Sequence, residues 1–123
     1  MVLDPLYVHN PGKHLTDDVY ANAATTAGMY HMDIIDIYRN AMAEAKRVLR
    51  PNGQLWVKCK DEVESGRQCW SHVEIYNAAQ ALGFCGQDLF VLVTQVPCGR
   101  RWGYNKQRHG RKNHSYLWIF KIT

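Results

Sequence analysis

The sequence predicts one α/β domain over residues 1–123, with helices flanking a mostly parallel sheet whose last strand is antiparallel. The first observation is that apolar residues recur at helical spacing in two segments, near 33–49 and 71–82. The second is that these segments alternate with short apolar strands, a pattern typical of parallel sheets. The predicted strands lie near residues 1–4, 54–60, 88–96 and 115–122. No helix separates the last two strands, so we expect the final one to return antiparallel.

Length and composition favour a single globular domain. A chain of 123 residues can bury about two thirds of its unfolded surface in one core. Its composition, with 46% hydrophobic and 21% charged residues, is that of an ordinary soluble protein. No apolar run approaches the roughly 20 residues of a membrane span, and the N-terminus lacks the features of a signal peptide. We therefore expect a cytoplasmic protein that does not contact membranes.

The first helix is predicted from about Asp33 to Leu49. Its apolar side chains would share one face: Ile34, Ile35, Tyr38, Met42, Ala45, Val48 and Leu49. Asp33 can cap the start, and Pro51-Asn52-Gly53 ends the helix. Before it, residues 8–32 have no sustained period, which predicts a long loop after the short buried strand Val2-Leu3.

Three more elements follow this helix. Residues 54–60 are predicted to form a strand. Ser71-His72-Val73-Glu74 has the spacing of a capping box, which predicts a second helix ending at Gly83. Residues 88–96 are nearly continuously apolar, and this pattern indicates a strand buried on both faces.

The cysteines do not predict a metal or redox motif. They lie at positions 59, 69, 85 and 98, and no C-x-x-C pair is present. Six histidines make a mixed Cys/His site arithmetically possible, but structural zinc sites usually take closely spaced pairs of ligands. We expect no metal, and reduced thiols that are mostly buried.

Nearly all the positive charge lies in one segment, residues 100–112, which we call the basic segment. Its cations are Arg100, Arg101, Lys106, Arg108, Arg111 and Lys112, and it has no acid. Of 15 lysines and arginines, nine remain elsewhere against all 11 acids, so the rest of the chain has a net charge of −2. A solvated loop is the simplest interpretation of a charge run. Because Trp102 and Tyr104 are interleaved with these cations, we favour contact with nucleic-acid phosphates and bases.

Three stretches resemble amino-group DNA methyltransferases. Asp4-Pro5-Leu6-Tyr7 resembles the (D/N/S)-P-P-(Y/F/W) motif, with Leu6 in place of the second proline. Residues 47–55 (RVLRPNGQL) are similar to the R-x-L-K-P-G-G entry to the fifth strand of class I methyltransferases. Residues 111–120 resemble the final hairpin of DNA methylase-like proteins. Helix, strand, helix and hairpin also follow the motif in the family's order, so the resemblance spans nearly the whole chain.

The resemblance implies a partial Rossmann-like methyltransferase sheet, with three parallel strands and one antiparallel C-terminal strand. It implies methyl transfer from S-adenosylmethionine to the exocyclic amino group of adenine or cytosine in DNA. The Asp4 carboxylate and the Pro5 carbonyl would accept hydrogen bonds from the amino group, and Tyr7 would stack on a flipped base. The alternatives are an RNA amino-group methyltransferase and a non-catalytic remnant that binds nucleic acid.

The cofactor half of that family is not apparent in the sequence. No G-x-G turn is present, and the chain begins in the middle of what would be the fourth strand. We therefore expect a fragment of a longer enzyme or a gene remnant, with S-adenosylmethionine held by the full-length parent. An open strand edge near the N-terminus and an apolar face on the helix near 33–49 would favour a homodimer. Alternatively, residues 8–32 cover that edge and the chain is a monomer.

Overall fold

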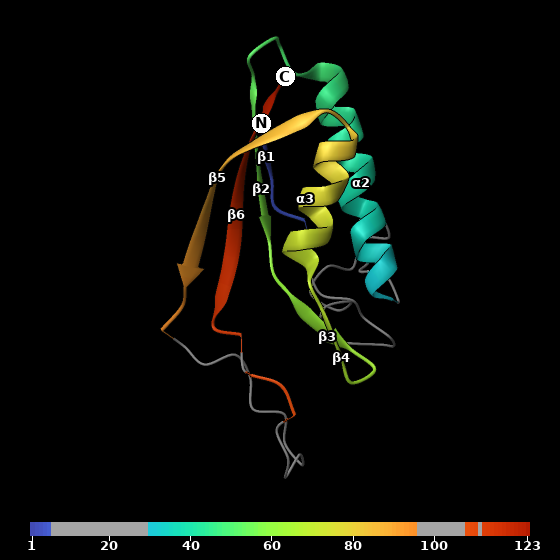
Figure 1. The fold of residues 1–123 in the computed structure, drawn as a ribbon, viewed down its shortest axis with the longest axis vertical. Coiled ribbons are helices and arrows are strands. Elements are labelled where there is room, and N and C mark those ends of the chain that lie inside the picture. Colours follow the sequence, from blue (N-terminus) through green and yellow to red (C-terminus); the bar gives the residue numbers. More distant parts are fainter. Residues whose placement is uncertain (6–29, 96–107, 111) are drawn as a thin grey trace, which may run out of the picture.

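A computed structural model describes residues 1–5, 30–95, 108–110 and 112–123 of the chain (Figure 1). In chain order the elements are β1 (Val2–Leu3), α2 (His31–Val48), β2 (Gln54–Cys59), β3 (Glu62–Glu64), β4 (Arg67–Cys69), α3 (Ser71–Ala81), β5 (Phe84–Val93) and β6 (His114–Ile122). The predicted alternation of strands and helices is confirmed. The small antiparallel hairpin β3–β4 was not predicted.

The main sheet has the strand order β1-β2-β6-β5. β1 pairs parallel with β2, with Leu3 opposite Val57, whereas β6 is antiparallel to both β2 and β5. The prediction of an antiparallel last strand is confirmed. The prediction of three parallel strands is confirmed only in part. β5 runs in the same direction as β1 and β2, but β6 lies between β5 and β2, so only one of the pairings described in this sheet is parallel.

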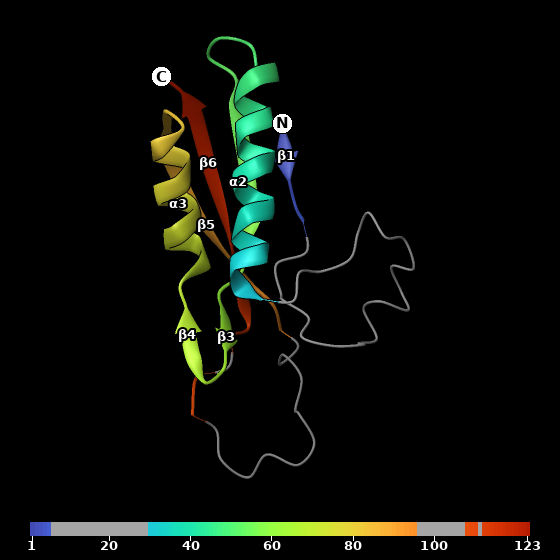
Figure 2. The same cartoon turned by 90° about the vertical axis from the view of Figure 1, so that its right-hand side faces the viewer.

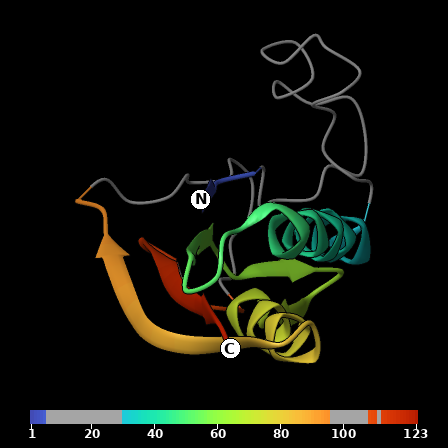
Figure 3. The same cartoon turned by 90° about the horizontal axis from the view of Figure 1, so that it is seen from above.

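Both helices cover one face of the sheet (Figure 3). The apolar core lies between that face and the two helices. The helical spacing of α2 buries Ile34, Ile35, Tyr38, Met42 and Ala45 completely or almost completely. They meet Leu55, Val57 and Cys59 of β2, Ile75 and Ala79 of α3, Phe84 of β5, and Phe120 of β6. The face of α2 that we expected to be open for a dimer is therefore occupied within its own chain.

The two helices begin differently from the prediction. α2 starts at His31, and Asp33 caps it by accepting a hydrogen bond from the Tyr30 backbone N–H at 2.9 Å. The predicted capping box of α3 was wrong. Ser71 lies inside the helix, and its buried hydroxyl has no hydrogen-bond partner within the described ranges. The cap comes from Asp61, whose Oδ1 accepts from the His72 backbone N–H at 3.1 Å.

β5 corrects another prediction, because it is not buried on both faces. It begins at Phe84, which is 3% exposed, but Leu89 to Val93 are between 39% and 75% exposed. The reason is its position at the edge of the sheet, where it curves away from α3 (Figure 3). Gly86 permits the close approach of α3 at the start of the strand, since a Cβ there would lie 2.8 Å from the Tyr76 ring.

Two smaller expectations concern the thiols and the membrane. Cys59 is buried, but Cys69 is only half-buried and Cys85 is exposed, so the expectation of mostly buried thiols was wrong for the described cysteines. Within the described ranges, no helix has both the length and the apolar character needed to cross a membrane.

Candidate functional site

The candidate site lies at one end of the main sheet. Because β1 and β2 are parallel, their carboxyl ends lie together, and the amino-terminal ends of α2 and α3 point to the same end (Figures 1 and 2). The β3–β4 hairpin lies there too. We call this end the carboxyl edge. Open α/β sheets bind ligands outside the carboxyl ends of their strands.

Asp4 follows β1 directly and lies at the carboxyl edge. Its Oδ2 is 3.4 Å from Nζ of Lys58 on the neighbouring strand β2. The register of the parallel pair explains the contact, because Leu3 lies opposite Val57 and the next residues of both strands are adjacent. The Asp4 side chain remains 48% exposed, so its carboxylate is accessible to a ligand.

The other two predicted catalytic residues are only partly described. Pro5 is half-buried next to Asp4, and its carbonyl follows the strand as the motif requires. Tyr7 lies outside the described residues, so its predicted stacking role stays a prediction. The structure thus brings the first half of the motif to the edge where ligands are expected.

A partly buried polar cluster that the sequence did not predict lies at the same edge. We call it the His31 cluster: His31, Glu62, Glu64 and Glu74. His31 Nδ1 is 2.6 Å from Glu62 Oε1, and Nε2 is 2.9 Å from Glu74 Oε1. The His31 backbone N–H donates to the Glu64 carboxylate. Burial lowers the pKa of His31, but the hydrogen bonds with Glu62 and Glu74 outweigh it, and the net result is a raised pKa.

A second pair, Asp61 and His72, joins the end of β2 to the start of α3. Asp61 is 2% exposed, and its two carboxylate oxygens lie 2.8 and 2.9 Å from His72 Nδ1. The imidazole stacks on Tyr116 of β6, with ring centroids 4.1 Å apart. Trp118 donates from Nε1 to the His72 carbonyl at 3.0 Å. These contacts hold the ring in one orientation at the carboxyl edge.

Cys59, at the end of β2, is buried close enough to Asp61 to feel its charge. Burial, reinforced by the negative charge of Asp61, raises the pKa of Cys59 to about 12. The reactive form of cysteine is the thiolate, which is scarce at neutral pH for such a group. Burial and Asp61 likewise raise the pKa of Tyr116. Covalent chemistry at Cys59 is therefore not supported.

Only part of the basic segment can be placed. Arg108 is exposed, and Lys112 donates from Nζ to the Gly110 carbonyl at 2.9 Å. His109 Nε2 lies 2.8 Å from the Gly66 carbonyl, so this end of the segment touches the β3–β4 turn. Arg100, Arg101, Lys106 and Arg111 lie outside the described residues. Contact between this segment and nucleic acid therefore stays a prediction.

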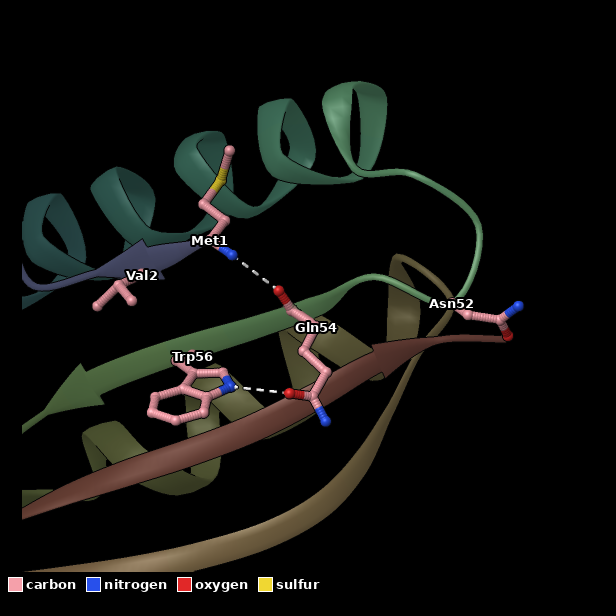
Figure 4. Close-up of a pocket in the computed structure, with 5 residues that line it drawn as sticks. All are labelled: Met1, Val2, Asn52, Gln54 and Trp56. Carbon is pink, nitrogen blue, oxygen red and sulfur yellow. Dashed lines mark hydrogen bonds between the residues drawn. The ribbon is translucent and has the colours of Figure 1, made fainter.

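An open hollow of about 470 Å³ lies at the opposite end of β1 and β2. Its lining residues are Met1, Val2, Asn52, Gln54 and Trp56 (Figure 4). The Met1 ammonium donates to the Gln54 carbonyl at 2.9 Å, and Trp56 donates from Nε1 to Gln54 Oε1 at 3.2 Å. No carboxylate, imidazole or thiol is among the described residues that line this hollow, so we do not assign a reaction to it.

The described residues do not fit S-adenosylmethionine. In the family that the sequence resembles, a glycine-rich turn holds the methionine part of this cofactor. The glycines in the described part are Gly53, Gly66, Gly83, Gly86 and Gly110, and none lies between the carboxyl end of a strand and a helix. We therefore assign no cofactor-binding residue. Where the structure is described, it also lacks three His, Cys, Asp or Glu residues placed to hold a metal ion.

Sequence reasoning missed the two histidine–carboxylate groups because each histidine is 11 to 43 residues away from its carboxylate partners. One signal was available. Asp61, Glu62 and Glu64 follow the predicted strand 54–60 directly, and acidic side chains after a strand belong to the carboxyl edge of a parallel sheet. The histidines carried no comparable pattern.

Comparison with solved structures identifies a protein with a similar fold. No protein-family model and no curated protein sequence matches the chain. Two crystal structures of TTHA0409 from Thermus thermophilus, described as a putative DNA modification methylase, are similar in structure. The selenomethionine form has 19% identity and a TM-score of 0.55, and the match covers 75% of this chain and 38% of that one. The complex with S-adenosyl-L-methionine has 16% identity and a TM-score of 0.58, and the match covers 98% of this chain and 43% of that one. At these identities the likeness concerns the fold alone: this chain is folded like about two fifths of that protein.

Proposed function

We propose that the chain is the C-terminal half of the catalytic domain of an amino-group DNA methyltransferase, and that it recognises the amino group to be methylated. The observation that carries this proposal is the position of Asp4 and Pro5. They follow a parallel strand at the carboxyl edge, in a fold similar to part of a DNA modification methylase. The methyl donor would be S-adenosyl-L-methionine, as bound in the structural relative.

The chemistry of the target explains why acceptors are needed. An exocyclic amino nitrogen of adenine or cytosine is a poor nucleophile, because its lone pair is delocalised into the ring. Two acceptors directed at its two N–H bonds favour the tetrahedral nitrogen that attacks a methyl group. The Asp4 carboxylate and the Pro5 carbonyl are both acceptors, and Lys58 lies within 3.4 Å of Asp4 to orient it. A Tyr7 ring stacked on the base would hold the base in place beside these two acceptors.

The proposal is tested by the chain's preference for an amino-bearing base. Two DNA duplexes are compared by fluorescence anisotropy: one has an unpaired adenine, the other purine, which lacks only the amino group. A hydrogen bond to a charged group contributes about 1.5–3 kcal/mol, so adenine should bind at least about tenfold more tightly. Asp4→Ala should remove most of this preference, because alanine has no side-chain acceptor for the amino group.

Asp36→Ala is the matched control. Asp36 is an exposed carboxylate on α2 that pairs with Arg39 at 3.2 Å, so the variant loses the same charge away from β1. The control should keep the preference for adenine. Equal affinity for the two duplexes in the unmodified chain would contradict the proposal.

Two alternatives are decided by the same measurements. A non-catalytic module that binds nucleic acid is favoured by the basic segment and by the lack of a cofactor cradle in the described residues. It would bind both duplexes tightly and equally. An RNA-directed enzyme of the same chemistry would prefer adenine in RNA over adenine in DNA. Calorimetric titration with S-adenosylmethionine then shows whether this chain binds the donor unaided.

A further inference from the structure

The His31 cluster contains more carboxylates than one neutral histidine can satisfy. A neutral imidazole has one N–H and one bare nitrogen, and the bare nitrogen cannot donate to a carboxylate. Here both ring nitrogens are within hydrogen-bond distance of carboxylate oxygens, at 2.6 and 2.9 Å. The geometry therefore requires the doubly protonated ring, or a proton on one of the two glutamates.

The cluster joins three elements that are distant in the sequence. His31 is the first residue of α2, Glu62 and Glu64 belong to β3, and Glu74 lies in the first turn of α3. The backbone N–H and Nδ1 of His31 both bond to β3, and its Nε2 bonds to α3. One residue thus ties the hairpin to the amino-terminal ends of both helices. Figure 2 shows the hairpin at this end of α2 and α3.

We propose that protonated His31 is a pH-sensitive pin that holds the β3–β4 hairpin against α2 and α3, and that losing this proton loosens the hairpin. The inference does not depend on the proposed function. Its consequence is local, because the apolar core between α2 and the main sheet does not include the hairpin.

The charges around the pin account for its sensitivity. Glu62 and Glu64 face it from β3, Glu74 from α3, and the Cys69 thiol of β4 lies in the field of all three glutamates. Asp33 of the same helix is bonded to the Tyr30 backbone. With His31 protonated, one cation offsets three carboxylates. When it is neutral, three carboxylates share a partly buried site and repel one another.

The direction of the pH effect follows from the sign of the shift. The folded pKa of His31 lies above its ordinary value of 6.5. The contribution of the pin to stability is therefore fully present below pH 6.5 and is lost as pH rises through the raised folded pKa. The hairpin should loosen on the alkaline side, while the rest of the fold stays intact.

The test follows the histidine and the hairpin separately. Nitrogen-detected NMR of the imidazole rings reports the protonation of His31, and Trp70 fluorescence reports the hairpin, since Trp70 follows β4 and is 55% exposed. We expect His31 to remain doubly protonated above pH 6.5, and the Trp70 signal to change at the pH where it deprotonates. Because other tryptophans contribute, Trp70→Phe identifies the signal.

Two variants make the outcome decisive. In Glu62→Gln/Glu74→Gln, amides that both donate and accept can satisfy a neutral ring, so the linked transition should move to lower pH or vanish while the hairpin stays docked. Glu74→Gln alone is the milder version, because Glu74 is 35% exposed and the variant should fold. The control is His109→Asn. His109 contacts the hairpin turn at Gly66 and is not a member of the His31 cluster, so this variant should leave the transition unchanged. The proposal would be overturned if the His31 ring titrates at or below pH 6.5, or if the Trp70 fluorescence does not change when His31 loses its proton.

Discussion

The carboxylate of Asp4 and the ammonium of Lys58 lie 3.4 Å apart across the only parallel strand pair described in the main sheet. Parallel pairing brings these residues together although 54 positions separate them in the sequence. The register of β1 and β2 places the proposed acceptor at the carboxyl edge, next to the Lys58 ammonium. The side chains of this ion pair are 31% and 48% exposed, so its role should be in recognition more than in stability.

Replacing Lys58 with glutamine should therefore separate recognition from folding. We expect the free energy of unfolding in urea to change by less than about 1 kcal/mol, since partly exposed ion pairs contribute little. The affinity ratio between adenine and purine duplexes should fall, because Asp4 loses the partner that orients it. Lys46→Gln on α2 removes the same charge and should leave the ratio unchanged. A ratio that is the same in Lys58→Gln as in the unmodified chain would show that the pair does not orient Asp4.

The basic segment should make DNA binding strongly dependent on salt. Each phosphate contact contributes about 0.9 to the slope of log affinity against log salt concentration. Arg108→Ala/Arg111→Ala should thus reduce the slope by about 1.8 if both side chains contact phosphates. Arg39→Ala/Arg47→Ala is the matched control, because both arginines pair with acids on the surface of α2. Equal slopes for all three proteins would mean that the segment is only a solvated loop.

The cysteines should differ sharply in reactivity under mildly alkaline conditions. Cys85 is exposed, whereas Cys59 is buried and its pKa is raised to about 12. In a Cys98→Ser background, Ellman's reagent should modify Cys85 quickly and Cys59 only after denaturant is added. Mass spectrometry of peptides identifies the modified residue. Rapid modification of Cys59 in the folded protein would contradict the burial of β2.

Phe120 should contribute far more to stability than the apolar residues of β5. It is fully buried and lies against the rings of Phe84 and Trp118. Phe120→Ala should cost about 3–5 kcal/mol, because a large cavity replaces the ring. Val93→Ala removes an apolar side chain that is 75% exposed, so the free energy of unfolding should change by less than about 0.5 kcal/mol. Urea denaturation of the two variants measures the contrast, and similar losses would contradict the edge position of β5.

Self-association stays a prediction, and the surface expected to form the dimer interface is smaller than the one expected from the sequence. The apolar face of α2 is buried in its own chain, whereas Val2 and Trp56 are 65% and 41% exposed. We expect light scattering at micromolar concentration to give about twice the monomer mass of 14.2 kDa, and Val2→Asp to restore the monomer. Met32→Asp, at an apolar residue 51% exposed on α2, should remain dimeric. A monomer of 14.2 kDa for the unmodified chain would exclude this dimer.

The sequence by itself determined the helices and strands whose apolar residues recur at a regular spacing along the element. The helix predicted over 33–49 is α2 (His31–Val48), and the strand predicted over 54–60 is β2 (Gln54–Cys59). Both follow from local periodicity, because a helix or strand must place its apolar side chains on the face that packs. The Asp4-Pro5 motif was likewise visible as local sequence after a strand.

Tertiary structure alone decided which distant residues meet. β6 inserts between β2 and β5, so β5 becomes an edge and its apolar run is exposed despite a pattern typical of a buried strand. Asp61 caps α3 in place of Ser71, and Glu74 bonds to His31 instead of closing a capping box. A local pattern states which hydrogen bonds a side chain is able to make. Competition from partners elsewhere in the chain decides which of them form, and that competition exists only once the sheet has brought the ends of β2, α2 and α3 together.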